Sequence, residues 1–94
     1  MEVNVKFISP LSLMIKKTDI KIELENSRFT LKELFEKIAI EFPKIHEKIC
    51  TTDHKLNQGF LCVHNNEIVL TEEINKRFIY ENDEIVISVA IAGG

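Results

Sequence analysis

Glycine is scarce in this chain, and its few glycines are unevenly placed. The 94 residues include three glycines, and two of them are Gly93 and Gly94, the last residues of the sequence. Glycine has no Cβ atom, so the backbone at such positions fits a narrow channel and adopts unusual φ values. A loose end without function is the alternative, because chain termini are often poorly ordered. The rest of the sequence has to decide between these two interpretations.

Other features are also missing, and each absence argues against a class of protein. The chain has two cysteines, Cys50 and Cys62, and no basic N-terminal stretch followed by an apolar run, which favours the reducing cytoplasm over a secreted disulfide scaffold. No segment approaches the roughly 18 apolar residues of a membrane span. The net charge of −3 argues against nucleic acid or an anionic membrane as the main partner. We therefore expect a cytoplasmic protein that binds neither.

Alternating apolar residues predict β-strands in a single domain. Residues 2–7 and 19–25 both alternate apolar and polar side chains, and the two segments are expected to pair as a hairpin. The turn between them, over residues 9–17, is expected to keep three apolar anchors (Leu11, Leu13 and Met14). Later strands are predicted over residues 59–64, 67–70 and 84–89.

One helix is predicted between the second and third strands. Thr30 and Glu33 have the spacing of a capping box, in which each side chain bonds the backbone of the other. Apolar residues then recur at helical spacing and predict one buried stripe: Leu31, Leu34, Phe35, Ile38, Ala39 and Phe42. Pro43 is expected to end the helix. Residues 44–58 look irregular, with Ile45, Ile49 and Leu56 as anchors, and residues 71–80 look like a connector with a short helical turn.

The order of these elements resembles the β-grasp fold of ubiquitin and its relatives. The resemblance implies an α+β domain with a mixed sheet of four to five strands and one main helix packed on one face. The first and last strands should be adjacent and parallel at the centre of the sheet. A single helix leaves the other face of the sheet to water or to a partner. We expect a domain over residues 1–89 and a flexible tail over residues 90–94.

Several local motifs resemble those of the small ubiquitin-like sulfur-carrier proteins, which include the small subunit of molybdopterin synthase and the thiamine-pathway carrier. The motifs are the opening strand Val3–Phe7, the helix Thr30–Ile38, its exit Glu41-Phe42-Pro43, and the acidic turn and last strand Glu81–Ile87, followed by Ala92-Gly93-Gly94. The family usually has a glycine in the turn before the last strand, where this chain has Asn82. It often has Asn-Gly after the third strand, where this chain has Asn65-Asn66, and asparagine supplies the same positive φ. The proline that molybdopterin relatives often carry before the tail is absent.

The resemblance implies a function for the tail. Gly94, with Gly93 before it, would present a terminal carboxylate that an adenylating enzyme activates with ATP and that sulfur transfer converts to a thiocarboxylate. The carrier would then donate sulfur within a larger synthase subunit, most naturally in molybdenum cofactor biosynthesis. It would bind no permanent cofactor and would not be an enzyme on its own. Three alternatives stay open. The protein could be a thiamine or tRNA-thiolation carrier, a modifier conjugated to lysines, or an interaction module with an inert tail.

A group of apolar residues stands out of phase with the expected core positions of their strands. If they gather on the open face of the sheet, they form an apolar patch, which usually marks an interface. The predicted partner interface is Ile8, Leu61, Val86, Ala90 and Ala92.

Three potential metal ligands follow one another at helical spacing. His46, Cys50 and His54 would share one face of a continuous helix and could then bind a metal ion. Their segment has no capped apolar stripe, so we interpret them as polar surface residues and predict no metal site. His64 is interpreted as a turn residue at a strand end, and Cys62 as a small core residue.

Overall fold

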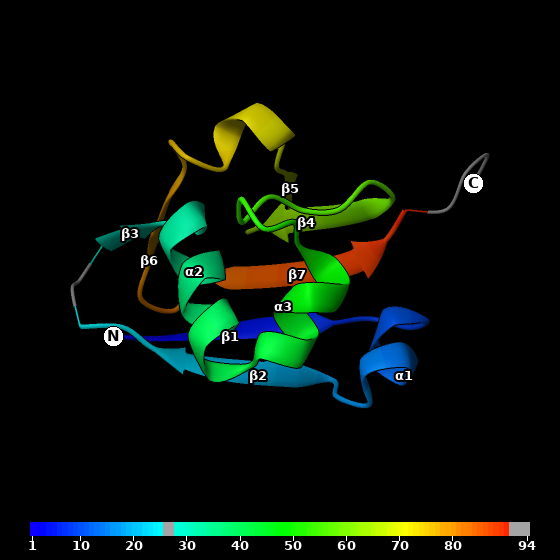
Figure 1. Cartoon of the computed structure of the whole chain (residues 1–94). Coiled ribbons are helices and arrows are strands. Elements are labelled where there is room, and N and C mark those ends of the chain that lie inside the picture. Colours follow the sequence, from blue (N-terminus) through cyan, green and yellow to red (C-terminus); the bar gives the residue numbers. More distant parts are fainter. Residues whose placement is uncertain (26–27, 91–94) are drawn as a thin grey trace.

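The computed structural model describes residues 1–25 and 28–90 of the chain as a mixed sheet with two helices on one face (Figure 1). No helix in this described part is long and apolar enough to cross a membrane. In chain order the elements are β1 (Glu2–Phe7), α1 (Leu11–Ile15), β2 (Asp19–Glu23), β3 (Arg28–Thr30), α2 (Leu31–Glu41), α3 (Pro43–Ile49), β4 (Phe60–His64), β5 (Glu67–Ile68), the 3-10 helix η1 (Thr71–Glu73), β6 (Phe78–Tyr80) and β7 (Glu84–Val89).

The main sheet has five strands in the order β2-β1-β7-β4-β5. β1 pairs with β7 in parallel, with Val5 opposite Ile85, and the other neighbours pair antiparallel. The predicted hairpin of β1 and β2 is confirmed, as is the parallel pair of first and last strands at the centre. The chain has the β-grasp fold that the sequence predicts. β7, the strand that leads to the tail, therefore lies at the middle of the sheet with a paired strand on each side.

The core lies between the sheet and the helices, because one set of alternating side chains on each strand points toward α2 and α3. Cys62 on β4 and Ile87 on β7 face each other there and are fully buried. The fully buried side chains of the helices come mainly from α2: Leu31, Leu34, Phe35 and Ile38. Burying apolar surface in this way is the main source of stability for a chain of this size.

Helix α2 begins as its sequence predicts. The Thr30 hydroxyl accepts a hydrogen bond from the Glu33 N–H at 3.2 Å, and the Thr30 N–H donates to Glu33 Oε1 at 3.2 Å. This capping box satisfies backbone groups that a helix start otherwise leaves unpaired. At the other end Phe42 is partly buried and its N–H still bonds the Ile38 carbonyl, at 2.7 Å.

The prediction that residues 44–58 are irregular is wrong over the first half of the segment. Pro43 ends α2, but it is also the first residue of a second helix, α3, because a proline at that position loses no intrahelical hydrogen bond. Ile45 and Ile49 anchor α3 in the core as predicted, and Leu56 is partly buried. Two helices rather than one therefore cover the sheet.

Three further expectations need correction. Residues 9–17 contain the short helix α1, in which Leu11 is buried, whereas Leu13 and Met14 are 74% and 54% exposed and anchor nothing. The connector 71–80 contains η1 and also β6, which pairs with β3 in a separate two-stranded sheet. Strand β4 begins at Phe60, and β5 ends at Ile68.

Three asparagines in turns adopt left-handed backbone conformations, as expected from the sequence. Asn65 and Asn66 have φ values of 48° and 70° in the turn between β4 and β5. Asn82 has a φ of 71° in the turn before β7. Asparagine tolerates this region better than most residues, so these turns form without glycine.

Candidate functional site: the open face of the sheet beside the tail

The face of the sheet opposite α2 and α3 is divided into a polar half and an apolar half. Over β1 and β2 it presents charged and polar side chains, such as Lys6, which pairs with Glu84 at 3.6 Å. The cross-strand register continues from Lys6 to Val86 on β7, then to Val63 on β4 and Ile68 on β5. The character of the face thus changes from polar to apolar at the central strand.

The apolar half gathers side chains that the structure leaves partly or largely exposed. Val86, Val63 and Leu61 are partly exposed, and Ile68 is 59% exposed. Ile8 and Ala90 are exposed just after the ends of β1 and β7, at the same end of the sheet. We call this group the open-face patch: Ile8, Leu61, Val63, Ile68, Val86 and Ala90.

Four of the five residues of the predicted interface belong to this patch. Ile8, Leu61, Val86 and Ala90 share one face of the sheet, whereas Ala92 lies outside the described residues. Val63 and Ile68 are not part of the predicted interface. Val63 has the same strand parity as Leu61, and this parity was a signal that could have included it. That this patch binds a partner stays a prediction.

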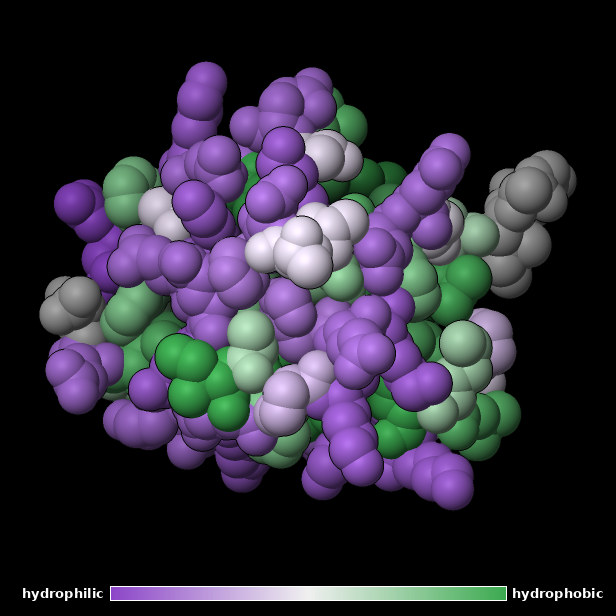
Figure 2. All heavy atoms as spheres, viewed as in Figure 1, coloured by the Kyte–Doolittle hydropathy of each residue, from purple (hydrophilic) through white to green (hydrophobic). Residues whose placement is uncertain are grey.

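The helix side of the molecule has a different surface. Among the described residues it is mostly hydrophilic, with hydrophobic side chains lying among charged ones (Figure 2). Scattered apolar residues are normal on protein surfaces, whereas a contiguous patch marks an interaction site. The contrast favours the open face as the functional side.

The point where the chain leaves the sheet is fixed by backbone hydrogen bonding. β7 ends at Val89, and the Ala90 N–H then donates to the Gly59 carbonyl at 2.7 Å. Gly59 has a φ of +92°, a conformation that side-chain-bearing residues rarely adopt. The third glycine of the chain therefore shapes the backbone that holds the base of the tail. Gly93 and Gly94 lie outside the described residues, so their role and the division into a domain over 1–89 and a tail over 90–94 stay predictions.

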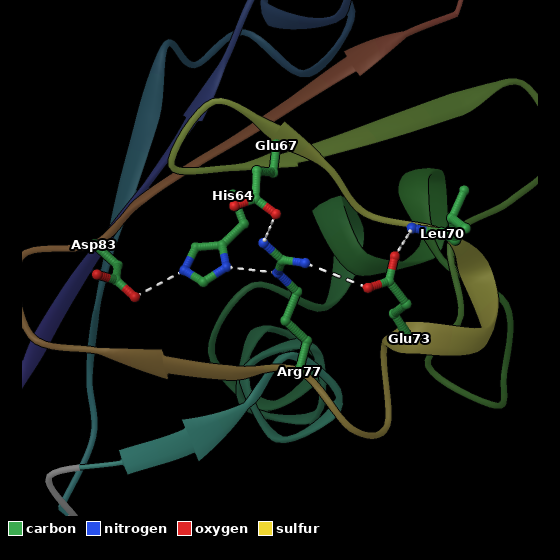
Figure 3. A network of polar contacts seen from close by, with 6 residues as sticks. All are labelled: His64, Glu67, Leu70, Glu73, Arg77 and Asp83. Carbon is green, nitrogen blue, oxygen red and sulfur yellow. Dashed lines mark hydrogen bonds and ion pairs between the residues drawn. The ribbon is translucent and has the colours of Figure 1, made fainter.

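A buried polar network holds the turn from which β7 starts (Figure 3). His64 is 6% exposed, and its Nε2 lies 2.7 Å from Asp83 Oδ2. Arg77 Nε donates to His64 Nδ1 at 2.8 Å, and its guanidinium also reaches Glu67 and Glu73 at 2.9 and 3.3 Å. Because the arginine donates a hydrogen bond to Nδ1, the ring N–H of His64 is at Nε2. This N–H donates a hydrogen bond to the Asp83 carboxylate. The interpretation of His64 as a turn residue is thus wrong.

The network gives Asp83 a definite influence on stability and on its pH dependence. Burial alone would raise the pKa of the Asp83 carboxyl, but bonds from Asn65, His64 and the Tyr80 N–H hold that pKa below its usual value. A lowered pKa means that the ionised group stabilises the fold above the ordinary aspartate pKa of about 3.9, and that this contribution is lost as the pH falls through the lower folded value.

We expect Asp83→Asn to lower the free energy of unfolding at pH 7 by about 1.5–3 kcal/mol, the range for hydrogen bonds to a charged group. The difference from the unsubstituted protein should shrink as both are unfolded by urea at progressively lower pH. Asp53→Asn, at an exposed position, serves as the control and should change little. An equal loss for Asp83→Asn at every pH would contradict the assignment of an ionised Asp83.

The two cysteines are placed as core residues. Cys50 and Cys62 are free and buried, and burial raises the pKa of each thiol to about 12. A thiol with so high a pKa is protonated at neutral pH and is a poor nucleophile. The prediction that Cys62 is a core residue is confirmed, and neither thiol has the lowered pKa of a reactive cysteine.

The prediction that His46, Cys50 and His54 are surface residues is wrong for the first two, which are buried, whereas His54 is partly exposed. His46 is buried on α3, Cys50 is buried just after it, and the His54 ring meets His46 with Nε2 and Nδ1 3.0 Å apart. Among the described residues no three metal-binding side chains come together. The segment therefore brings two of its three candidate ligands into contact and leaves Cys50 apart.

Comparison with solved structures finds the same fold in proteins of low sequence identity. Small archaeal modifier protein 1 (SAMP1) of Haloferax volcanii superposes with a TM-score of 0.77 at 13% identity over 100% of both chains. A chain of the BexX/CysO complex of Amycolatopsis orientalis gives 0.70 at 19% identity, over 98% of this chain and 99% of that one. The putative molybdopterin converting factor subunit 1 of Pyrococcus furiosus gives 0.63 at 17% identity, over 97% and 99%.

Comparisons with protein-family models and with curated proteins find no match. At these low sequence identities, the structural similarity shows the fold alone. Its extent over nearly the whole of each chain leaves no large part of this protein unmatched. The protein has the β-grasp fold of the ubiquitin-like proteins.

Proposed function

We propose that this protein is a sulfur carrier that works as the small subunit of a molybdopterin synthase. The observation that carries the proposal is the open-face patch, which lies on and beside β7, the strand that leads directly into the Ala92-Gly93-Gly94 tail. Binding surface and reactive end then belong to one element, so a partner that docks on the patch receives the tail. The β-grasp fold and the resemblance of the helix and last-strand motifs support the same function.

The chemistry would take place at the Gly94 carboxylate. A carboxylate is a poor acyl donor until one oxygen becomes part of a leaving group. Its attack on the α-phosphorus of ATP, in the partner adenylating enzyme, would release pyrophosphate and form an acyl-adenylate. Hydrosulfide would then attack the acyl carbon and displace AMP, which leaves a thiocarboxylate. No side chain of this protein needs to act as a catalyst.

The tail has the reach and the slimness that such a delivery needs. Extended, the five residues from Ala90 to Gly94 span about 16–18 Å at about 3.3–3.6 Å per residue. This length crosses a subunit boundary, and the two terminal glycines present no Cβ atoms to a narrow channel. The hydrogen bond from Ala90 to Gly59 would act as the fixed base from which the tail is aimed.

Val86→Lys tests the role of the open-face patch. Val86 is partly exposed at the centre of the patch, so a lysine there should cost the fold no more than about 1 kcal/mol. In the complex the added charge would be buried against an apolar partner surface without a counter-ion, which is costly. We expect at least about a tenfold weaker affinity for the larger synthase subunit, equivalent to about 1.4 kcal/mol, by isothermal titration calorimetry.

Asn4→Lys adds the same charge on the polar half of the same face and is the matched control. It should bind the larger subunit with nearly unchanged affinity. If Val86→Lys instead collapses the thermal stability, Val86 is a core residue and the patch is wrongly assigned. If both variants bind equally well, the partner docks elsewhere.

A protein modifier conjugated to lysines is the second candidate, favoured by the structural match to a protein named small archaeal modifier protein 1. Incubation with the adenylating enzyme, ATP and sulfide separates the two. A carrier yields the free chain with a thiocarboxylate, whose sulfur passes to the synthase. A modifier yields covalent adducts of higher mass with an isopeptide bond to lysine. Both require Gly94 to be the last residue of the mature chain, which the mass of the starting protein verifies.

A further inference from the structure

The contact between His46 and His54 joins two parts of the chain that the proposed function does not use. His46 lies on the buried side of α3, and His54 lies in the loop that connects α3 with β4. The two rings are tilted by 59° with their centroids 5.0 Å apart, and His46 Nε2 lies 3.0 Å from His54 Nδ1. Without a metal ion, the N–H of one ring donates a hydrogen bond to the ring nitrogen of the other.

The separation of the two nitrogens matches that of two rings bound to one metal ion. Imidazole nitrogens bind zinc at about 2.0–2.1 Å, so two rings on one ion at right or tetrahedral angles have nitrogens about 2.8–3.4 Å apart. The pair is already at this distance, so an ion could bind without a large movement of α3 or the loop. The bridging proton would move to the other nitrogen of the donating ring, so both contact nitrogens would offer lone pairs.

The local structure prepares both rings for this role. The loop is closed by hydrogen bonds around Thr51, whose N–H donates to the Lys55 carbonyl at 2.7 Å and whose carbonyl accepts from the His54 N–H at 3.0 Å. His54 has a φ of 61°, a left-handed conformation that side-chain-bearing residues adopt only rarely. Such a conformation tends to be kept where it places a functional side chain.

We propose that His46 and His54 form a chelating pair for a divalent transition metal ion of the Zn²⁺, Ni²⁺ or Cu²⁺ class. Imidazole suits these ions, whereas Mg²⁺ and Ca²⁺ prefer oxygen ligands. Water molecules complete the coordination, because among the described residues no third metal-binding side chain lies with this pair. This inference replaces the sequence-based prediction that the protein holds no metal, and it is independent of sulfur transfer.

The experiment is a titration of the full chain with ZnCl₂ and, separately, NiCl₂ at neutral pH, followed by calorimetry and by NMR of the histidine rings. We expect one ion per chain, with shifted ring signals of His46 and His54 and an unchanged signal of His64. The affinity should fall as the pH is lowered, because protons compete for the same nitrogens. Since His54 lies in a loop, His54→Ala should keep the fold and lower the affinity at least about tenfold.

Lys55→Ala, next to His54 and without a ligating group, is the control and should bind at least as tightly as the unsubstituted chain. The proposal is overturned if neither ion binds in large excess, or if His54→Ala binds as tightly as the unsubstituted chain. It is also overturned if the bound ion shifts His64 and leaves the other two rings unchanged.

Discussion

The variant that lacks Gly93 and Gly94 is expected to show no ATP–pyrophosphate exchange with the cognate adenylating enzyme, and therefore no sulfur loading. Without the two glycines the carboxylate sits two residues short of the reactive centre, and the residue that bears it has a side chain. A channel that closes around bare backbone cannot accept that end. The loss should be complete within the sensitivity of the exchange assay, because the reacting group itself is misplaced.

The same deletion should leave the fold unaffected. The free energy of unfolding is expected to stay within about 0.5 kcal/mol, as is usual for changes at a chain terminus. One alanine added after Gly94 should be almost as damaging to exchange, because it moves the carboxylate and adds a Cβ atom. Exchange at the normal rate by the deletion variant would make the tail an accident of sequence and the protein a plain interaction module.

Phe35→Ala is expected to produce the largest loss of stability among single substitutions considered for this protein. Phe35 is fully buried on α2 between the helix and the sheet. Truncation of a buried aromatic removes its burial and leaves a cavity, at a cost of about 3–5 kcal/mol in the free energy of unfolding. Denaturation by urea, monitored by circular dichroism, measures the change. In a domain of this size such a loss is a large part of the total stability.

Ile40→Ala lies on the same helix and is the matched control. Ile40 is 74% exposed, so its truncation should change stability by less than about 0.5 kcal/mol. If Phe35→Ala does not fold at all, Phe35→Leu, which keeps much of the volume, should fold with an intermediate stability. Equal effects of Phe35→Ala and Ile40→Ala would contradict the packing of α2 on the sheet.

The main sheet and α2 could be predicted from the sequence because their signals are local and strong. Val3, Val5 and Phe7 alternate with polar residues, and all three are buried as this period requires. The capping box at Thr30 predicts the start of α2 to the residue. Asparagine at the turn positions carries the same conformational signal that glycine would.

The elements that were missed have weak or ambiguous signals. Pro43 both ends α2 and begins α3. The sequence pattern alone predicts only the end of α2. Strands β3 and β6 have three residues each, too few to establish a period, and they form through pairing with each other. α1 has only five residues, and no side chain caps its N-terminus, so the sequence carries no clear helix signal there.

The polar network shows a different limit of sequence reasoning. His64 has the same strand parity as the buried Cys62, a signal that the interpretation of His64 as a turn residue did not use. A histidine there is tolerated because Arg77 and Asp83 satisfy both ring nitrogens. These partners lie 13 and 19 residues away along the chain, and nothing in the local sequence pairs them.

The candidate site was predictable where it follows from strand parity. Leu61 and Val86 are out of phase with the core of their strands, and the structure places them on neighbouring strands of the same face. The contact of His46 with His54 was not predictable, because it depends on a loop that folds back on α3. Their spacing on a continuous helix suggested a shared face, whereas α3 ends at Ile49 and a turn brings the rings together.

The measurement that tests the central claim most directly is the intact mass of the protein after co-expression with its adenylating enzyme and a sulfur source. The account predicts a fraction of the chain heavier by the difference between one sulfur and one oxygen atom, with the increment located at Gly94 by fragmentation. This fraction should be absent when Gly93 and Gly94 are deleted. An unchanged mass, in the presence of an enzyme that carries out pyrophosphate exchange with this protein, would contradict the assignment of the protein as a sulfur carrier.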